Sequence, residues 1–289
     1  MDQAEQLRII KANKQNRPLA RVITVTSGKG GVGKSNMSIN LAIHFRKMGK
    51  RVIILDADFG LANIEIMFGA VPKHNLCDLI YQGKNIKEII TWGPMDVGFI
   101  SGGSGIAGMS NLSKDYLDYI IQNLSELDSI ADVIIVDTGA GIADAVLEFL
   151  VASGEILLVT TPEPTSITDS YSLLKVLYRH PRFKEDMTKV KMVANRVEKE
   201  AEGEVLFEKL NAVVTRYLKV PMTYLGSVPQ DAQVAKAVMQ QMPVSLQNPG
   251  CKASLAYEKI AMRLMEKEEV EKQPKRGMAA FFSHIIQRL

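Results

Sequence analysis

The sequence predicts an α/β protein built on one mostly parallel β-sheet with helices on both faces. Short β-branched runs recur along the chain, and they are continuously apolar, as in strands that are buried on both faces. Segments with helical spacing, such as 35–49, lie between them, and this alternation is typical of a sheet covered on both sides. The runs are VITVT (22–26), VIILD (52–56), VGFI (97–100), VIIVD (133–137), ILLVT (156–160) and VKMVAN (190–195).

Four segments are predicted along the chain. Residues 21–265 contain no stretch that resembles a linker, so we expect them to form a single domain. The charged run 266–277 contains a proline and a glycine and is typical of a linker. Residues 1–20 are expected to form an N-terminal helix or tail, and residues 278–289 a C-terminal amphipathic helix.

The composition excludes several classes of protein. The chain has 289 residues, of which 46% are hydrophobic and 23% charged, as in ordinary globular proteins. It contains no run of about 18 apolar residues, which a membrane span requires, and its first residues do not resemble a secretory signal. The two cysteines form no C-x-x-C pair, and the four histidines show no metal-ligand spacing. These features predict a cytoplasmic protein that is neither secreted nor an integral membrane or cysteine-ligated metal protein.

The net charge of +3 is concentrated at the N-terminus. Residues 1–21 contain five basic and two acidic side chains, which leaves 30 of each in the remainder. A neutral body with a basic tail argues against DNA binding through overall charge.

A glycine-rich segment between a predicted strand and a predicted helix fits the pattern G-x-x-x-x-G-K-[ST]. Its glycines allow backbone N–H groups to surround phosphate oxygens, and the helix start adds partial positive charge. Within it, Lys34 is predicted to reach the β- and γ-phosphates and Ser35 to hold Mg²⁺. The predicted nucleotide-binding segment is Gly28, Lys29, Gly30, Gly31, Val32, Gly33, Lys34 and Ser35.

The additional lysine at position 29 makes GKGGVGKS a deviant Walker A sequence, and the chain resembles the MinD/ParA class of P-loop ATPases. In that class the additional lysine crosses to the ATP of a second subunit, so the resemblance implies a nucleotide-sandwich homodimer. A second cation there opposes the charge of the transferring phosphoryl group, as an arginine finger does. The alternative for Lys29 is a solvated lysine in the loop.

Three aspartates follow predicted strands. Asp56 and Asp58 end VIILDAD, and Asp137 ends VIIVD, so all three face the crevice where α/β proteins bind ligands. By resemblance, Asp58 positions the attacking water, Asp56 supports Mg²⁺ and its waters, and Asp137 is the Walker B aspartate, which holds Mg²⁺ through a water. With Lys29 and Lys34, Asp58 completes the expected catalytic set. The alternative is that each aspartate caps the turn after its strand.

The resemblance also implies a binding site for the base. Asn195 and Arg196 close the strand VKMVAN, as the adenine-contacting asparagine of the class does. The amide of Asn195 can pair with the N6/N1 edge of adenine. Pro229, Gln230 and Asp231 resemble the segment that lines the other side of the base. ATP is favoured over GTP because the guanine signature N-K-x-D is absent from these positions.

The C-terminal segment is predicted to bind a membrane. Its apolar side chains fall within an arc of about 140° at 100° per residue, and basic residues lie just upstream. This pattern is typical of an interfacial helix on anionic lipid, although the linker is poor in lysine. The alternative is a helix docked on its own domain. The side chains expected to enter the lipid are Phe281, Phe282, Ile285, Ile286 and Leu289.

The N-terminal segment D-Q-A-x-x-L-R looks like the activator helix of the FlhG (YlxH) flagellar-number ATPases, which stimulates the SRP-type GTPase FlhF. The stretches 56–69, 102–106 and 160–175 are similar to that group as well. Glutamine and arginine are plausible donors to a phosphate or its attacking water. The residues expected to activate the partner are Asp2, Gln3, Leu7 and Arg8.

These features lead to one functional hypothesis with three rivals. The chain is expected to be an ATPase switch of low intrinsic rate that forms an ATP-dependent homodimer and cycles onto the inner face of the cell membrane. The resemblance implies control of flagellar number and placement, with FlhF, flagellar C-ring proteins and anionic lipid as partners. The rivals are a MinD-type division-site regulator, a ParA-type DNA-segregation ATPase and an adapter that binds ATP without hydrolysing it.

Overall fold

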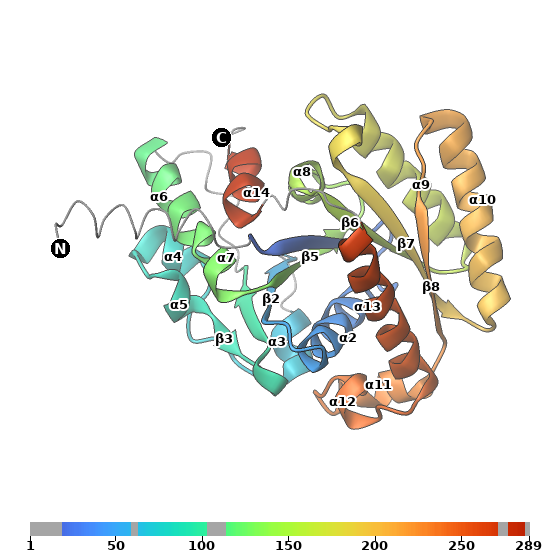
Figure 1. Ribbon diagram of the computed structural model, residues 1–289, viewed down its shortest axis with the longest axis horizontal. Coiled ribbons are helices and arrows are strands. Elements are labelled where there is room, and N and C mark those ends of the chain that lie inside the picture. The colour runs from blue at the N-terminus through green and yellow to red at the C-terminus, as the bar shows by residue number, and fades with distance from the viewer. Residues whose placement is uncertain (1–18, 59–62, 103–113, 271–276, 287–289) are drawn as a thin grey trace.

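The structure is a computed structural model that describes residues 19–58, 63–102, 114–270 and 277–286. Its centre is a mostly parallel, eight-stranded sheet (Figure 1). The strands are β1 (Arg21–Ser27), β2 (Val52–Ala57), β3 (Thr91–Trp92), β4 (Gly98–Ser101), β5 (Val133–Ala140), β6 (Glu155–Thr160), β7 (Lys189–Val197) and β8 (Thr223–Pro229). Their order is β3-β4-β2-β5-β1-β6-β7-β8, and only the β3–β4 pair among them is antiparallel.

The predicted fold class is confirmed, and each of the six predicted strands is present. Two edge strands were not predicted. β3 has two residues, which is too short to give a pattern. β8 reads TYLGSVP, and its apolar run is interrupted by Gly226 and Ser227. Gly226 has a φ of +134°, and the register of β8 against β7 shifts between Met192 and Val193, next to it.

Helices cover both faces because the side chains of the central strands alternate between two apolar layers. Val52 and Ile54 of β2 enter one layer, whereas Ile53 and Leu55 enter the other. The first layer is covered by α2 (Lys34–Lys47), α3 (Asn63–Phe68), α11 (Ala232–Met239), α12 (Val244–Gln247) and α13 (Lys252–Val270). The second is covered by α4 (Leu76–Gln82), α5 (Ile86–Ile89), α6 (Lys114–Ser125), α7 (Leu127–Ile130), α8 (Asp144–Ala152), α9 (Pro164–Arg179), α10 (Glu200–Leu218) and α14 (Gly277–Ile286). Two short 3₁₀ turns complete the described elements, η1 (Pro94–Asp96) and η3 (Glu185–Met187).

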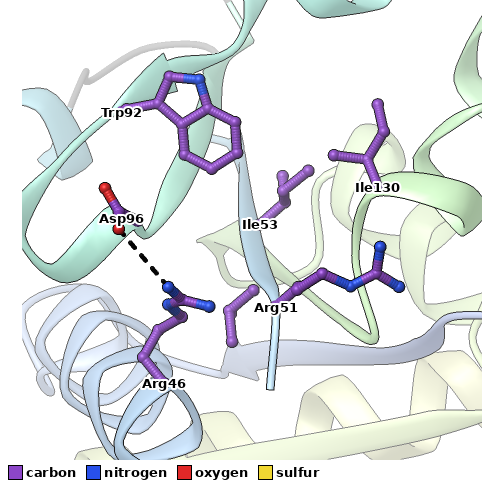
Figure 2. A pocket seen from close by; sticks show the side chains of 7 residues that line it. Arg46, Arg51, Ile53, Trp92, Asp96 and Ile130 are labelled. Carbon is purple, nitrogen blue, oxygen red and sulfur yellow. Dashed lines mark ion pairs between the residues drawn. The ribbon is translucent and has the colours of Figure 1, made fainter. Parts of the chain in front are cut away.

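A cavity of about 220 Å³ opens at the amino ends of β2 and β5, opposite the ends that carry the predicted site (Figure 2). Its two arginines are engaged within the chain. Arg46 pairs with Asp96 at 3.7 Å, and the guanidinium of Arg51 lies 2.7 Å from Asp132. The other lining residues are Asp96 and the apolar Val52, Ile53, Trp92 and Ile130, so this cavity does not provide the free cations that a phosphate site requires.

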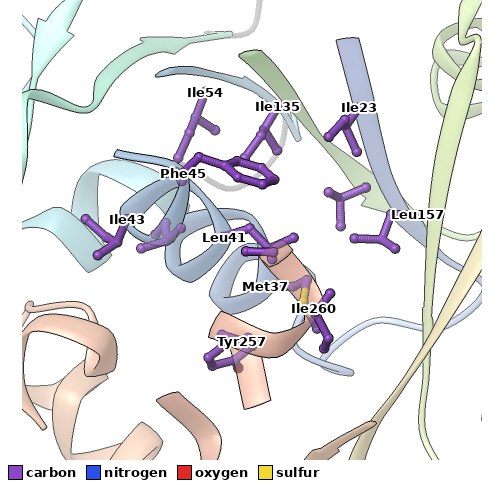
Figure 3. Packing of buried hydrophobic residues seen from close by; sticks show 14 of the residues in the cluster. Ile23, Met37, Leu41, Ile43, Phe45, Ile54, Ile135, Leu157, Tyr257 and Ile260 are labelled. Atoms are coloured by element: carbon purple, nitrogen blue, oxygen red, sulfur yellow. The ribbon is translucent and has the colours of Figure 1, made fainter. Parts of the chain in front are cut away.

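The packing of α2 and α13 on the sheet fixes the position of the phosphate loop. Leu41 and Phe45 of α2 face Ile135 of β5, and Tyr257 of α13 packs against the other side of α2 (Figure 3). These side chains are at most 1% exposed. Because burial of each large apolar side chain contributes about 1.5–3 kcal/mol, α2 is held firmly, and so is the loop that precedes it.

The C-terminal region differs from the prediction at the linker, and its last helix takes the docked arrangement that was the alternative to membrane binding. α13 continues to Val270, so the first part of the predicted linker 266–277 is helical. The helix predicted to lie on a membrane, α14, instead packs on the protein's own core between α6 and α8 (Figure 1). The predicted membrane-inserting side chains Phe281, Phe282 and Ile285 are only 2%, 1% and 6% exposed. An amphipathic helix buries its apolar stripe wherever an apolar surface is offered, and here the domain offers one.

Two further predicted membrane-binding side chains, those of Ile286 and Leu289, lie outside the part of the chain whose side chains the structure describes. The N-terminal residues Asp2, Gln3, Leu7 and Arg8 also lie outside the described residues. Within the described residues, we find no helix that combines the length and the apolarity needed to cross a bilayer.

Candidate nucleotide site

The phosphate loop joins β1 to α2 at the carboxyl edge of the sheet. Gly31 and Gly33 have φ values of +74° and +100°, a conformation that glycine adopts without strain. Gly28 lies directly against the backbone of Asp169 and Ser170 in α9, where a Cβ would collide. The sequence therefore places glycine at two positions with a positive φ and at one where the close approach of α9 leaves no room for a Cβ.

Lys34 is the first residue of α2 and is buried, with 8% of its surface exposed. Burial lowers the pKa of its ammonium group, and the negative charges of Asp137 and Asp58 oppose this effect. A cation held between two carboxylates beneath the phosphate loop is suited to bind the terminal phosphates of a nucleotide.

Asp137, the fifth of the eight residues of β5, is fully buried. It accepts a hydrogen bond from the hydroxyl of Ser38 at 2.8 Å, and a further one from Ser35. Burial raises its pKa to about 6, despite the hydrogen bonds and Lys34. Its second oxygen, Oδ2, has no hydrogen-bond partner among the described residues.

This orphaned oxygen fits a site for hydrated Mg²⁺. Mg²⁺ keeps several water ligands and is held by one or two protein oxygens together with substrate phosphates. Ser35 would be a direct ligand, and Asp137 would accept hydrogen bonds from the metal's waters. Within the described ranges, no group of three or more histidine, cysteine, aspartate or glutamate side chains is arranged for a metal. Ser35 and Asp137 are oxygen donors of the kind that suit Mg²⁺ bound together with a nucleotide.

Asp56 is paired in register with Asp137 across β2 and β5. Burial and the neighbouring charge of Asp137 raise its pKa to about 7. Its carboxylate accepts the backbone N–H groups of Asp58 at 3.1 Å and of Ile64 at 3.3 Å. Asp56 thus fixes both ends of the loop between β2 and α3, and it remains close enough to Asp137 for the two charges to interact.

Asp58, the predicted catalytic aspartate, directly follows β2 and lies beside the carboxyl end of β5. Its Oδ1 would be 3.7 Å from a Cβ built on Gly139, and Asn63 donates to its Oδ2 at 3.5 Å. Asp58 also acts electrostatically on Lys34 and Asp137. The structure therefore brings the three predicted aspartates together at the phosphate loop, close to Lys34 and to Ser35, the third residue predicted to hold Mg²⁺.

Lys29 is bound to the start of α9. Its Nζ donates to Glu163 Oε2 at 2.7 Å and to Thr165 Oγ1 at 2.8 Å. Both acceptors lie at the start of α9, and the lysine lowers the pKa of Glu163 through the hydrogen bond and its charge. The prediction did not include Glu163 or Thr165. Their only local signal is Glu-Pro at the start of a helix that directly follows a strand.

The predicted base-binding residues lie at the ends of β7 and β8. Asn195 donates from Nδ2 to the carbonyl of Val32 at 2.6 Å, so here it supports the phosphate loop. Arg196 is exposed and has a φ of +57°. The carboxylate of Asp231 accepts the backbone N–H groups of Gln233 and Ala253 at 2.9 and 3.2 Å.

This arrangement joins the start of α11 to the start of α13. Pro229 ends β8, and Gln230 is tied to β7 by its N–H bond to Val197 O at 2.9 Å. The segment 229–231 and Asn195 therefore lie at one edge, beside the phosphate loop. Contact of these residues with adenine stays a prediction.

Comparison with known proteins agrees with this geometry. The family model described as the CobQ/CobB/MinD/ParA nucleotide binding domain matches residues 23–244. The chain belongs to the MinD/ParA family. As a member of that family it is a nucleotide-binding ATPase, and its relatives identify it as FlhG-like.

Two relatives match this MinD/ParA-family protein over almost its full length. It is 40% identical over 267 residues to the antiactivator FleN of Pseudomonas aeruginosa, covering 92% of this chain and 94% of that protein. It is 33% identical to the flagellum site-determining protein YlxH of Helicobacter pylori, covering 95% and 92%. A structure of MinD from Pyrococcus horikoshii complexed with Mg-ADP has a TM-score of 0.68 at 21% identity, covering 88% of this chain and 100% of that one.

Proposed function

We propose that this chain is an ATPase switch that dimerises on ATP, cycles between cytoplasm and membrane, and controls flagellar number and placement. The observation that carries the proposal is the position of Lys29. In a nucleotide site where Lys34, Asp58 and Asp137 converge, the additional lysine of the phosphate loop is bound instead to Glu163. A cation that does not serve its own site is available to a second copy of the chain.

In the proposed cycle the N–H groups of the phosphate loop and Lys34 bind the β- and γ-phosphates of ATP. Ser35 would hold Mg²⁺, which would supply positive charge to the phosphates, and Asp137 would accept hydrogen bonds from its waters. Asp58 orients the attacking water from the loop beside Gly139. Lys29 of one protomer, once released from Glu163, stabilises the phosphoryl charge in the other protomer, and its withdrawal after hydrolysis returns the chain to the monomer.

Membrane attachment in this cycle requires α14 to leave its docking site. Undocking exposes Met278, Phe281, Phe282 and Ile285, each at most 6% exposed in the docked state. At about 1.5–3 kcal/mol for each large apolar side chain, the cost is of the order of 6–12 kcal/mol before lipid compensates it. A dimer that carries two such helices binds lipid much more tightly than a monomer with one. ATP-dependent dimerisation would therefore control membrane binding.

The flagellar role rests on the relatives and on the N-terminal sequence. FleN and YlxH match along nearly the whole chain, and the segment D-Q-A-x-x-L-R begins before the ATPase domain. We propose that Asp2, Gln3, Leu7 and Arg8 stimulate the SRP-type GTPase FlhF. Flagellar C-ring proteins are the second class of partner. The protein would be cytoplasmic and reversibly bound to the inner face of the cell membrane.

Co-sedimentation tests the switch. The Asp58→Ala protein should bind ATP without hydrolysing it, so the dimer accumulates. It is mixed with anionic liposomes or with duplex DNA, in ADP or in ATP. We expect pelleting with liposomes in ATP only. Pelleting with DNA instead would contradict the membrane cycle and favour a ParA-type segregation ATPase, whereas equal pelleting in ADP and ATP would contradict the switch.

A GTPase assay separates the flagellar role from that of a MinD-type division-site regulator. Full-length protein should accelerate GTP hydrolysis by FlhF, and Gln3→Ala should remove the acceleration. Gln15→Ala, a matched change in the same N-terminal segment, should not. Acceleration that survives Gln3→Ala would contradict the assignment of this residue. An ATP turnover assay excludes the non-hydrolysing adapter if wild type, unlike Asp58→Ala, releases phosphate.

A further inference from the structure

The N-terminal end of α14 is attached to the domain by a carboxylate. The backbone N–H of Met278 donates to Asp128 of α7, at 2.9 Å from Oδ1 and 3.1 Å from Oδ2. The same carboxylate accepts the N–H of Ala20 at 3.3 Å, just before β1. A negative charge at this end stabilises a helix, since the first N–H groups have no partner within the helix and carry partial positive charge.

The C-terminal end of α14 is attached by a guanidinium. Arg182 follows α9, and its Nη1 donates to the carbonyl of His284 at 2.8 Å. The other terminal nitrogen is hydrogen-bonded to the carboxylate of Glu148 on α8, which is only 8% exposed. His180 Nε2 lies 4.0 Å from the same carboxylate. Arg182 is therefore held in place by a buried acid, and its charge faces the end of the helix where cations are favourable.

We infer that Asp128 and Arg182 form a two-ended polar clamp that sets how readily α14 leaves the domain, with Glu148 positioning the arginine. The inference rests on the proposed function, in which α14 must leave to reach lipid. Apolar contacts supply most of the docking energy but do not distinguish one nucleotide state from another. The clamp has a geometry that a small shift of α8 or α9 breaks, because hydrogen bonds weaken steeply with distance and angle.

Both helices that hold Arg182 begin at the nucleotide site. α8 carries Glu148 and also Phe149, whose ring centroid lies 5.9 Å from that of Phe281 in α14. It starts just after Gly141, whose N–H donates to Ser27 O at 2.9 Å beside the phosphate loop. α9 starts at the residues that hold Lys29 and ends before Arg182. Closure of the site on ATP would move these helix starts, and the clamp lies at their far ends.

Hydrogen exchange on the nucleotide-free, full-length protein tests the clamp without any lipid. We expect Asp128→Asn and Arg182→Gln each to speed amide exchange in residues 277–286 by about tenfold or more, because each weakens a charge-assisted hydrogen bond. Exchange in α2 and α10 should not change. Asp186→Asn and Arg179→Gln, matched changes at exposed sites, should leave α14 as in wild type.

Hydrogen exchange in α14 also tests whether Glu148 acts by positioning Arg182. If it acts through Arg182, Glu148→Gln should speed exchange in α14, and adding it to Arg182→Gln should have no further effect. Independent, additive effects would contradict its role as a positioning residue. If Arg182→Gln also loosens α9 and α10, Asp128→Asn, which changes a carboxylate on a different element, decides the question. Unchanged exchange in Asp128→Asn would overturn the clamp.

Liposome binding without ATP separates the clamp from the proposed function. If the clamp variants show faster exchange in α14 and also pellet with liposomes without ATP, both the clamp and the membrane role of α14 are supported. Faster exchange with no pelleting in any nucleotide state supports the clamp and contradicts the membrane role of α14.

Discussion

The ammonium of Lys29 lies 2.7 Å from the carboxylate of Glu163 within the same chain. Lys29 is therefore part of the phosphate loop in the sequence, but its side chain contacts the start of α9. Its side chain is 37% exposed and that of Glu163 is 53% exposed, so water screens the pair and the lysine can leave it at little cost. In this position its ammonium group is bound to Glu163 and Thr165 rather than to the aspartates of the nucleotide site.

Glu163→Gln should favour the ATP dimer. Loss of the carboxylate leaves Thr165 as the remaining acceptor for Lys29, and the lysine is freed more easily. We expect the dimer Kd in ATP to fall by less than about tenfold, since exposed ion pairs contribute little. Analytical ultracentrifugation with Asp58→Ala in the background measures it, and Glu208→Gln, an exposed change on α10, is the control. A weaker dimer would show that Glu163 acts in the dimer rather than in the monomer.

Gly33→Ala should abolish ATP binding. The residue has a φ of +100°, and an added Cβ would collide with the amide of Asn195, which supports the loop through Val32. Gly49→Ala is the matched control, because Gly49 also has a positive φ, +79°, but no atom lies within 4 Å of an added Cβ. Both changes should lower the free energy of unfolding by about 1–2 kcal/mol through the left-handed backbone.

Fluorescent-nucleotide titration and urea unfolding distinguish these two effects. Only Gly33→Ala should lose affinity for ATP. Equal loss of affinity in both variants would mean that backbone strain, and not the contact with Asn195, disrupts the loop.

The nucleotide-free protein should lose stability between about pH 6.5 and pH 4 through His44. Burial lowers the pKa of this imidazole to about 4, and Lys47 adds to the effect. In this window the unfolded chain binds a proton that the folded chain does not, so acidification favours unfolding. The loss from this group amounts to at most about 3 kcal/mol.

Urea unfolding of wild type and His44→Gln at pH 7 and pH 5 checks this expectation. The variant should lose less stability on acidification than wild type. His44 Nε2 lies 2.9 Å from Ser245 Oγ, and a glutamine can retain a hydrogen bond there. Parallel curves for wild type and His44→Gln would contradict the assignment.

Deletion of residues 277–289 should remove ATP-dependent liposome binding and also expose an apolar surface. α14 covers Phe149, Leu124 and Leu127, which are at most 1% exposed with the helix in place. We expect increased binding of an apolar dye and a lower melting temperature. Deletion of residues 287–289 alone is the control and should keep the docked helix. Liposome binding that persists without α14 would contradict its role as the membrane anchor.

The local chemistry of the nucleotide site could be read from the sequence. The residues from Gly28 to Ser35 are contiguous, and Asp56 and Asp137 each end an apolar run. Parallel strands bring their carboxyl ends to one edge, so adjacency of these groups follows from the pattern. The strands at the sheet edges could not be read in the same way, because β3 is very short and β8 is interrupted by Gly226.

Two features of the protein, the partner of Lys29 and the position of α14, are determined only by the tertiary structure. Whether Lys29 faces its own site or Glu163 depends on the contact between the phosphate loop and α9, which are 134 residues apart. Whether α14 covers lipid or protein depends on a groove made by α6, α7 and α8, and on Asp128 and Arg182 at its two ends. Hydrophobic periodicity determines that the helix has an apolar face. It does not determine which apolar surface is nearest, because that surface forms only when distant segments pack together.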